Sequence, residues 1–260
     1  MARLAWWRKD RGPTTAETID LKGFKDHTLS LNPDEYSSKL YGLSVLPDLC
    51  QGTGAVILPF RVYDSPKDFS IAHFLQYGFA RLLIRTDPKD DSAQTMGFWG
   101  SLPRTIITPQ TGDTISSMEA EAVQFMKKNR VHKSRRLRFI VHKLRDETDY
   151  ISHVQTNADL TTKTLDFRVK GLRGGMPEKN PVFRLGPSVS GRMHIGEDGH
   201  VAGRDESGLL SKDLMARTCT ILDLMIKFAQ ERGYYGFETS YVTYWDAPDV
   251  PEYYDLLFKG

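Results

Sequence analysis

The sequence contains few features of a secreted or membrane-spanning protein. Only two of its 260 residues are cysteines, Cys50 and Cys219, which is too few for a disulfide framework or a four-cysteine zinc site. The longest apolar run covers residues 55–60 and includes a proline, whereas a membrane-spanning helix needs about 20 apolar residues. The N-terminus has no apolar stretch of signal-peptide length. We therefore expect a folded protein of a reducing compartment, neither secreted nor carrying a transmembrane segment.

Sequence motifs for cofactors and metals are also missing. The segment Gly52-Thr53-Gly54 lacks the third glycine of a dinucleotide loop and precedes a predicted strand instead of following one. There is no Walker lysine pattern. The seven histidines are scattered, and the two closest, His194 and His200, have no cysteine nearby. We therefore predict neither a cofactor nor a metal site.

Three stretches have the pattern of helices. Residues 116–129 carry an apolar stripe and begin with Ser116 and Glu119, which have the spacing of a capping box. Residues 211–232 form the longest predicted helix and are followed by a glycine terminator. A shorter helix is expected within residues 30–49, and the proline near its end is expected to terminate it.

Several segments between these helices have the alternating pattern of strands. Residues 137–141 and 165–169 alternate apolar with charged side chains, and the turn sequence Gly196-Glu197-Asp198-Gly199 predicts a hairpin. Helices and strands are mixed without strict alternation. The pattern predicts an α+β fold with a mostly antiparallel sheet packed with two or three helices, including a long C-terminal helix.

The same pass along the chain predicts three regions. Residues 1–25 read as a flexible arm rich in basic and aromatic residues, which ends in an irregular threonine-rich stretch. Residues 26–246 are expected to form a single α+β domain. Residues 247–260 read as an exposed C-terminal tail.

The distribution of charge is more informative than its sum. The formal net charge is only +2, from 35 basic and 33 acidic residues. One window, residues 127–145, contains no acidic residue and nine basic ones, and removing it leaves 26 − 33 = −7. The nine basic residues are Lys127, Lys128, Arg130, Lys133, Arg135, Arg136, Arg138, Lys143 and Arg145. A cationic segment on an otherwise acidic chain is typical of a site for a polyanion.

We predict that the first seven of these cations, from Lys127 to Arg138, bind nucleic acid or another anion. The candidate polyanions are RNA or a ribonucleoprotein and an anionic membrane surface, and the same row of cations suits a nuclear import receptor. The alternative is purely structural: the lysines lie at the end of a predicted helix, where its dipole favours cations. The rest would then be a solvated turn and the outer face of a strand.

Both ends of the chain carry further candidate binding residues. Trp6, Trp7, Arg8 and Lys9 combine aromatic rings with cations, as in segments that bind anionic membranes. Such a short arm would need self-association to bind usefully. At the other end, Tyr254 and Leu257 have the spacing of a tyrosine-x-x-leucine short linear motif, which adaptors read in extended peptides.

One segment resembles a known family. The sequence Leu58-Pro59-Phe60-Arg61-Val62-Tyr63-Asp64-Ser65 resembles rhabdovirus matrix proteins, in which a Pro-Phe-Arg-x-Tyr strand leads through a helix to a further strand. The resemblance covers residues 55–84. It implies a non-enzymatic structural protein of the virion that self-associates into oligomers and links ribonucleoprotein to membrane. An import patch points to the plant-infecting members that assemble in the host nucleus; the N-terminal proline-tyrosine motif of the family is missing.

The resulting hypothesis is a viral matrix-like assembly protein of the host cytoplasm and nucleus. It would bind RNA and membrane and would not be an enzyme. A first alternative is a nucleic-acid-binding viral accessory protein, such as a movement protein or a silencing suppressor. A second is a metal-dependent nuclease that uses Asp64, Asp87 and Lys89, the residue types that hold a cation and orient water. Pro88 counts against the nuclease because it disturbs the strand that such a site requires.

Overall fold

The computed structural model describes residues 37–75, 81–88, 103–108, 114–132, 135–144, 150–171, 188–195, 201–202, 210–244 and 247–260. The chain divides into two compact units. Unit 1 comprises Met1–Ser37 and Leu58–Asp146, and unit 2 comprises Ser38–Ile57 and Glu147–Gly260. The predicted single domain is therefore replaced by two units, and the predicted arm, residues 1–25, lies outside the described residues.

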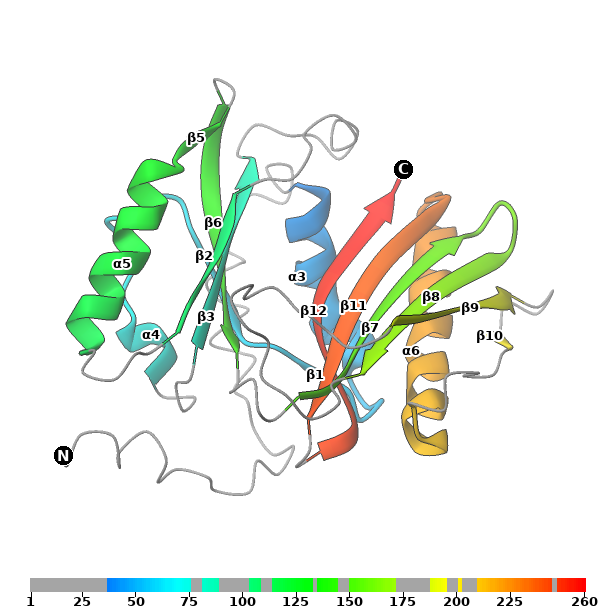
Figure 1. The fold of residues 1–260 in the computed structure, drawn as a ribbon. Helices are drawn as coiled ribbons and strands as arrows, with labels where there is room; N and C mark the ends of the chain where they lie inside the picture. Colours follow the sequence, from blue (N-terminus) through cyan, green and yellow to red (C-terminus); the bar gives the residue numbers. More distant parts are fainter. Residues whose placement is uncertain are drawn as a thin grey trace. The chain divides into compact units, whose positions relative to one another are not determined.

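Unit 1 is an antiparallel sheet with helices packed on one face (Figure 1). The strand order is β2-β6-β3-β4, with β5 pairing beside β6. The strands are β2 (Phe60–Tyr63), β3 (Arg81–Pro88), β4 (Arg104–Ile107), β5 (Val131–His132) and β6 (Arg135–Leu144), and the helices are α4 (Ala72–Leu75) and α5 (Ile115–Lys128). Every residue of β3 is buried.

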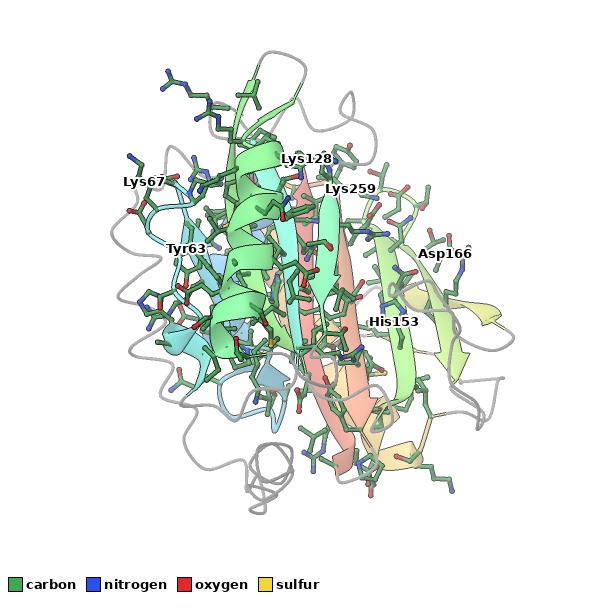
Figure 2. The ribbon with its side chains drawn as sticks, turned by 60° about the vertical axis from the view of Figure 1, so that its left-hand side comes forward. Tyr63, Lys67, Lys128, His153, Asp166 and Lys259 are labelled. Atoms are coloured by element: carbon green, nitrogen blue, oxygen red, sulfur yellow. The ribbon has the colours of Figure 1, made fainter. Side chains whose placement is uncertain are left out.

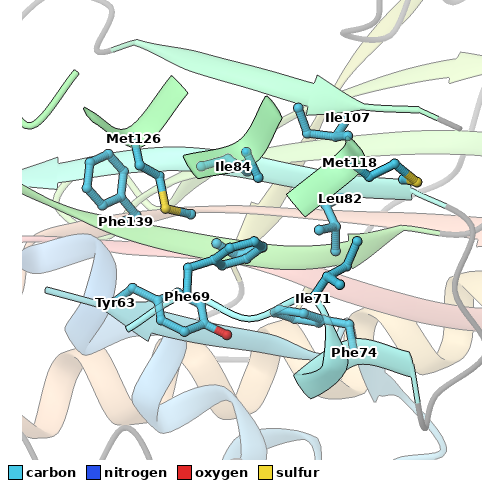
Figure 3. Packing of buried hydrophobic residues seen from close by; sticks show 12 residues of the cluster. Tyr63, Phe69, Ile71, Phe74, Leu82, Ile84, Ile107, Met118, Met126 and Phe139 are labelled. Atoms are coloured by element: carbon cyan, nitrogen blue, oxygen red, sulfur yellow. The ribbon is translucent and has the colours of Figure 1, made fainter. Parts of the chain in front are cut away.

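The core of unit 1 lies between α5, the α4 segment and one sheet face (Figure 3). Helix α5 contributes Met118, Ala122 and Met126, which recur at helical spacing, and β3 contributes Leu82 and Ile84, which recur at strand spacing. A carboxylate ties the two helical segments together, because the backbone N–H of Ile71 donates to Oε2 of Glu119 at 2.9 Å. The helix predicted over residues 116–129 is confirmed, but its capping box is formed by Thr114 and Ser117.

Unit 2 is a seven-stranded sheet in the order β1-β12-β11-β7-β8-β9-β10. Its strands are β1 (Val56–Ile57), β7 (Tyr150–Asp159), β8 (Thr164–Gly171), β9 (Ser188–Ile195), β10 (Val201–Ala202), β11 (Gly236–Tyr244) and β12 (Ala247–Lys259). Helices α3 (Ser38–Cys50) and α6 (Lys212–Glu231) pack on one face (Figure 1). All its strand pairs are antiparallel except β1 with β12, so the predicted α+β class is confirmed.

Aromatic packing joins both helices of unit 2 to the sheet. The ring of Phe258 in β12 stacks on Phe228 of α6 at 5.1 Å between centroids, and it meets Tyr41 of α3 edge-on at 6.1 Å. On the next row, the hydroxyls of Tyr241 in β11 and Thr218 in α6 are hydrogen-bonded at 2.8 Å. The predicted long helix is confirmed, with Ser211 as its N-cap.

Two predictions about unit 2 are wrong. Pro47 lies inside α3 instead of ending it. Residues 247–259, predicted as part of an exposed tail, form β12, which pairs with β11 along its length and with β1 at Glu252 and Tyr253. The run Tyr253 to Phe258 is rich in aromatic and aliphatic residues because it supplies side chains to a buried sheet. Among the described helices, none has the length and apolar character needed to cross a membrane.

Candidate functional site: an arginine face in unit 1

The unit 1 sheet has two faces of different chemistry. Leu82 and Ile84 of β3 point into the core beneath α5. The alternate residues Arg81, Leu83, Arg85 and Asp87 therefore belong to the opposite face. That face is also buried along β3, so its charged groups are held away from bulk water.

We name the arginine face after four guanidinium groups that the strand register brings to this side of the sheet. They are Arg81 and Arg85 of β3, Arg104 of β4 and Arg138 of β6. Arg136 of β6 is on the same side as Arg138, but it lies beyond the β3–β6 ladder and pairs with β5, so we do not count it here. Among the residues of this face that the β2–β6, β3–β6 and β3–β4 ladders pair, Asp87 is the single carboxylate, so the formal charge is 4 − 1 = +3. Arginine presents a planar fork of donors that matches carboxylate and phosphate oxygens, and it stays charged when buried.

The row at one end of the arginine face is an internal ion pair. Asp87 and Arg138 are directly opposite in the β3–β6 ladder, and Oδ2 of Asp87 lies 3.7 Å from Nε of Arg138. The hydroxyl of Ser37 donates to Oδ1 of Asp87 at 2.5 Å. All three residues are buried. Asp87 is thus held by a cation and a hydroxyl, and it serves to fix Arg138 in the sheet.

The next row has a different composition, because two like charges face each other. Arg85 and Arg104 are direct partners in the antiparallel β3–β4 ladder, so their side chains leave the same face side by side. Arg85 is buried, with 8% of its surface exposed, whereas Arg104 is exposed on the edge strand of the sheet. Like charges directly opposite one another across a ladder are destabilising. The pair therefore presents two guanidinium groups on neighbouring strands of one sheet face.

The other residues on the arginine face are aromatic or apolar. His142 of β6 is fully buried, pairs with Leu83, and packs its ring 5.7 Å from that of Phe60. Ile140 and Val62 continue the row of Arg85 toward β2. Apolar neighbours of this kind lower the local polarity and strengthen charge interactions at the face.

Unit 2 contains a second buried polar group, on the sheet face opposite its helices. Nε2 of His153 in β7 lies 2.5 Å from the hydroxyl of Tyr254 in β12, and the rings are stacked at 5.8 Å. Glu252 of β12 and His153 flank the same residue of β11, Val242. Figure 2 shows His153 on β7, on the same sheet as Asp166 and Lys259. Lys259 bridges Glu238 and Asn157 at 2.8 and 2.7 Å.

The structure separates the cations predicted as one site. Lys127, Lys128, Arg130 and Arg136 are exposed around the end of α5 and the β5–β6 hairpin. Arg138 is buried in its ion pair with Asp87, so it does not belong to that exposed group. Lys133 and the side chain of Arg135 lie outside the described part of the chain. Anion binding by the exposed four stays a prediction.

The predicted terminal motifs have different outcomes. Trp6, Trp7, Arg8 and Lys9 lie outside the described residues. Tyr254 is buried in β12 and hydrogen-bonded to His153, and Leu257 lies in the same paired strand. An adaptor that reads an extended peptide has no access to such a tyrosine, so the short-linear-motif prediction is wrong.

The alternative nuclease site is not assembled among the residues that the structure describes. Asp64 follows β2 and is exposed, whereas Asp87 is committed to Arg138 and Ser37. Lys89 lies outside the described residues. No group of three or more histidine, cysteine, aspartate or glutamate side chains in the described part of the chain could hold a metal ion.

The sequence analysis missed Arg81, Arg85 and Arg104. A signal for the first two was present, because the segment Arg81-Leu82-Leu83-Ile84-Arg85-Thr86-Asp87 places charges at alternate positions within an apolar strand. Charges spaced by four and then two residues share one face of a strand. Arg104 had no such signal, because its approach to Arg85 depends on the pairing of β3 with β4.

Comparison with known proteins finds similar solved structures but no family. No protein-family model matches the sequence, and no curated protein matches it. Among solved structures, the chain is similar to the D-cycloserine synthetase DcsG (12% identity, TM-score 0.41, 84% of this chain and 62% of that one). It is also similar to D-alanine–D-alanine ligase from Bacillus anthracis complexed with ATP (8%, 0.39, 81% and 53%) and to the ATP-grasp ligase PsnB complexed with minimal precursor (9%, 0.38, 84% and 51%). The chain spans less than two thirds of each of these proteins.

These neighbours overturn the matrix-protein hypothesis. They are ligases and synthetases, which are enzymes, and not viral structural proteins. The predictions that depended on this hypothesis are therefore wrong as well. They are the non-enzymatic function, the location in a virion, and the partners: ribonucleoprotein, membrane, an import receptor and further copies of the chain. The resemblance had a local cause: Phe60–Tyr63 is β2, with Phe60 and Tyr63 buried, and α4 and β3 follow. A strand, a helix and a further strand in this order occur in many α+β sheets.

Proposed function

We propose that the protein binds a nucleoside polyphosphate, with ATP as the first ligand to test, at the arginine face of unit 1 and uses it in an enzymatic reaction. The observation that supports the proposal is the direct pairing of Arg85 with Arg104 across the β3–β4 ladder. A polyphosphate placed between the two guanidiniums would form charge-assisted contacts with both of them.

The positions of the two arginines suit such a ligand. Arg85 is buried in the middle of a fully buried strand, so its guanidinium is held in a fixed position. Arg104 is exposed on the edge strand, where a ligand can reach it from solvent. The guanidiniums of Arg85 and Arg104 could bind neighbouring phosphate groups, because each guanidinium can donate hydrogen bonds to two oxygens.

The rest of the face adds charge without competing for the ligand. Arg81 lies on the same face of β3 as Arg85, four residues away, which is about 13 Å along the strand. Asp87 faces Arg138 and accepts from Ser37, so its negative charge is compensated inside the sheet. Fixed guanidiniums in a site of low polarity also stabilise charge that develops on a transferring phosphoryl group, which connects binding to catalysis.

The test is a titration of the full chain with ATP, followed by isothermal calorimetry. We expect Arg104→Gln to weaken ATP binding on the order of 10- to 100-fold, because one charge-assisted fork is lost. The free energy of unfolding of the ligand-free variant should stay within about 0.5 kcal/mol of the unaltered protein, because Arg104 is exposed. Weaker binding without lower stability distinguishes a ligand site from a structural one.

Arg168→Gln is the matched control. Arg168 is an exposed strand arginine of β8 in unit 2 and is not part of the arginine face. The proposal is wrong if unaltered protein fails to bind ATP in the millimolar range, or if Arg168→Gln weakens binding as much as Arg104→Gln. A stability loss in Arg104→Gln with unchanged ATP affinity would show that the arginine serves the fold. Release of inorganic phosphate from bound ATP then tests the enzymatic part.

A further inference from the structure

Four exposed cations form a cluster where α5 ends and the β5–β6 hairpin begins. We call Lys127, Lys128, Arg130 and Arg136 the hairpin cluster; all four are exposed. Their backbones are neighbours, because Asn129 caps α5 directly after the lysines and the carbonyl of Arg130 accepts from the N–H of Leu137 at 2.9 Å. Figure 1 shows the hairpin rising from the end of α5, and Figure 2 labels Lys128 there.

Local structure accounts for the lysines of the cluster but not for its arginines. Lys127 and Lys128 occupy the last turn of α5, where the helix dipole favours cations. Arg130 and Arg136 lie beyond the helix, and neither forms an ion pair within the described part of the chain. Four cations that gather on one exposed corner repel each other in the absence of an anion. Their arrangement is therefore suited to an external negative partner.

An exposed apolar side chain lies within the cluster. Val131 is directly opposite Arg136 in the β5–β6 ladder, so the two side chains share one face, and 53% of Val131 is exposed. It is one of only three large hydrophobic residues exposed among the described residues. The cluster thus offers a polypeptide both charge and an apolar contact.

We propose that the hairpin cluster docks an acidic segment of a partner polypeptide that also carries apolar side chains. Charge complementarity sets the sign, since all four members of the cluster are cations and the window from Lys127 to Arg145 holds no acid. The apolar contact at Val131 favours a polypeptide over a phosphate backbone. Residues 126–138 contain no phenylalanine, tyrosine or tryptophan, the residues on which single-stranded bases stack. The cluster does not include Arg85 or Arg104, and its member Arg136 lies beyond the β3–β6 ladder, so its test does not depend on ATP binding.

The experiment measures fluorescence anisotropy of a labelled peptide made of glutamates with interspersed leucines, titrated with the full chain. We expect the quadruple variant Lys127→Gln, Lys128→Gln, Arg130→Gln, Arg136→Gln to bind on the order of tenfold more weakly, because each exposed charge pair contributes modestly. Affinity of the unaltered protein should fall as salt rises. The matched control replaces four exposed cations elsewhere by glutamine: Lys67, Arg168, Lys212 and Lys227.

A second comparison isolates the apolar contact. Val131→Ser should weaken binding of the leucine-containing peptide but leave binding of a peptide with serines in place of leucines unchanged. Circular dichroism of each variant verifies that it is folded. The proposal is overturned by a quadruple variant that binds as the unaltered protein does, by an equal loss in the control set, or by no peptide binding at all. It is also overturned if single-stranded or duplex RNA displaces the peptide at lower concentration.

Discussion

Gly42 of α3 lies directly against the main chain of Leu256 in β12. A Cβ atom on Gly42 would lie far inside the van der Waals contact distance of the carbonyl oxygen of Leu256. The contact is made with backbone, which cannot move aside as a flexible side chain can. The absence of a side chain at position 42 is therefore what lets α3 approach the strand that carries the buried aromatic residues of unit 2.

We expect Gly42→Ala to destabilise the protein by about 3 kcal/mol, because the helix must move away from β12 or the strand must shift. Gly52→Ala is the comparison: Gly52 has a positive φ of 74° but nothing within 4 Å of an added Cβ. Its cost should stay near 1–2 kcal/mol, the price of a left-handed backbone for a residue with a side chain. Chemical denaturation measures both. Equal losses would contradict close packing at Gly42.

The buried pair of Asp87 and Arg138 gives a second prediction. Asp87→Ala should lower the free energy of unfolding by about 3–5 kcal/mol, because Arg138 is then left as a buried charge without its carboxylate. The double variant Asp87→Leu, Arg138→Met should recover much of this loss, since no charge remains to be desolvated. Ser37→Ala, which removes only the hydroxyl donor to Asp87, should cost about 1 kcal/mol. A double variant no more stable than Asp87→Ala would disprove the pairing.

Cys50 gives a prediction about alkaline pH. Burial raises the pKa of its thiol from 9.0 to about 12. In the unfolded chain the thiol ionises near pH 9 and in the folded protein it does not, so the unfolded state gains stability as pH rises. Stability should therefore fall between about pH 9 and pH 12, by at most about 1.4 kcal/mol per pH unit from this group.

Cys50→Ala is the matching variant for this pH dependence. It removes the titrating thiol, so its stability should decline less steeply with pH than that of the unaltered protein, in denaturation curves recorded from pH 8 to about pH 11. Burial also raises the pKa of the Tyr253 hydroxyl, and the remaining slope of the variant reports groups of that kind. Identical slopes with and without Cys50 would show that its thiol is not shielded in the folded state.

A helix or strand could be predicted from the sequence where its formation depends on residues that are close to one another along the chain. The helix of residues 212–231 was predicted from its own periodicity and its glycine terminator, and the β9–β10 pairing from the turn residues Gly196 to Gly199. Both depend on contacts within a few residues. By contrast, β12 was mistaken for a tail, because its aromatic run acquires meaning only from pairing with β11.

The candidate site follows the same rule. Asp87 was noticed as a charged residue beside a strand, but its role was misread because Arg138, its partner, is 51 positions away. Arg138 in turn was grouped with Lys127 and Arg136 by sequence proximity, although Arg138 is buried in its ion pair with Asp87 and the other two are exposed. Sequence proximity identified the hairpin cluster, whereas only strand register identifies the pairing of Arg85 with Arg104.

Lys163, in the turn between β7 and β8, gives the last prediction. Its φ of 52° is left-handed, a conformation that costs a residue with a side chain about 1–2 kcal/mol. The turn is held by Asp159, whose Oδ1 accepts from the N–H groups of Thr161 and Thr162 at 2.9 and 3.1 Å. The hydrogen bond from the Thr162 backbone lowers the pKa of Asp159.

Lys163→Gly should raise the free energy of unfolding by about 0.5–1 kcal/mol, because glycine adopts this φ freely, although it loses more entropy on folding. Lys163→Ala removes the same exposed charge and keeps the backbone cost, so thermal denaturation should show no gain for alanine. A gain shared by both variants would assign the effect to the charge and not to the turn.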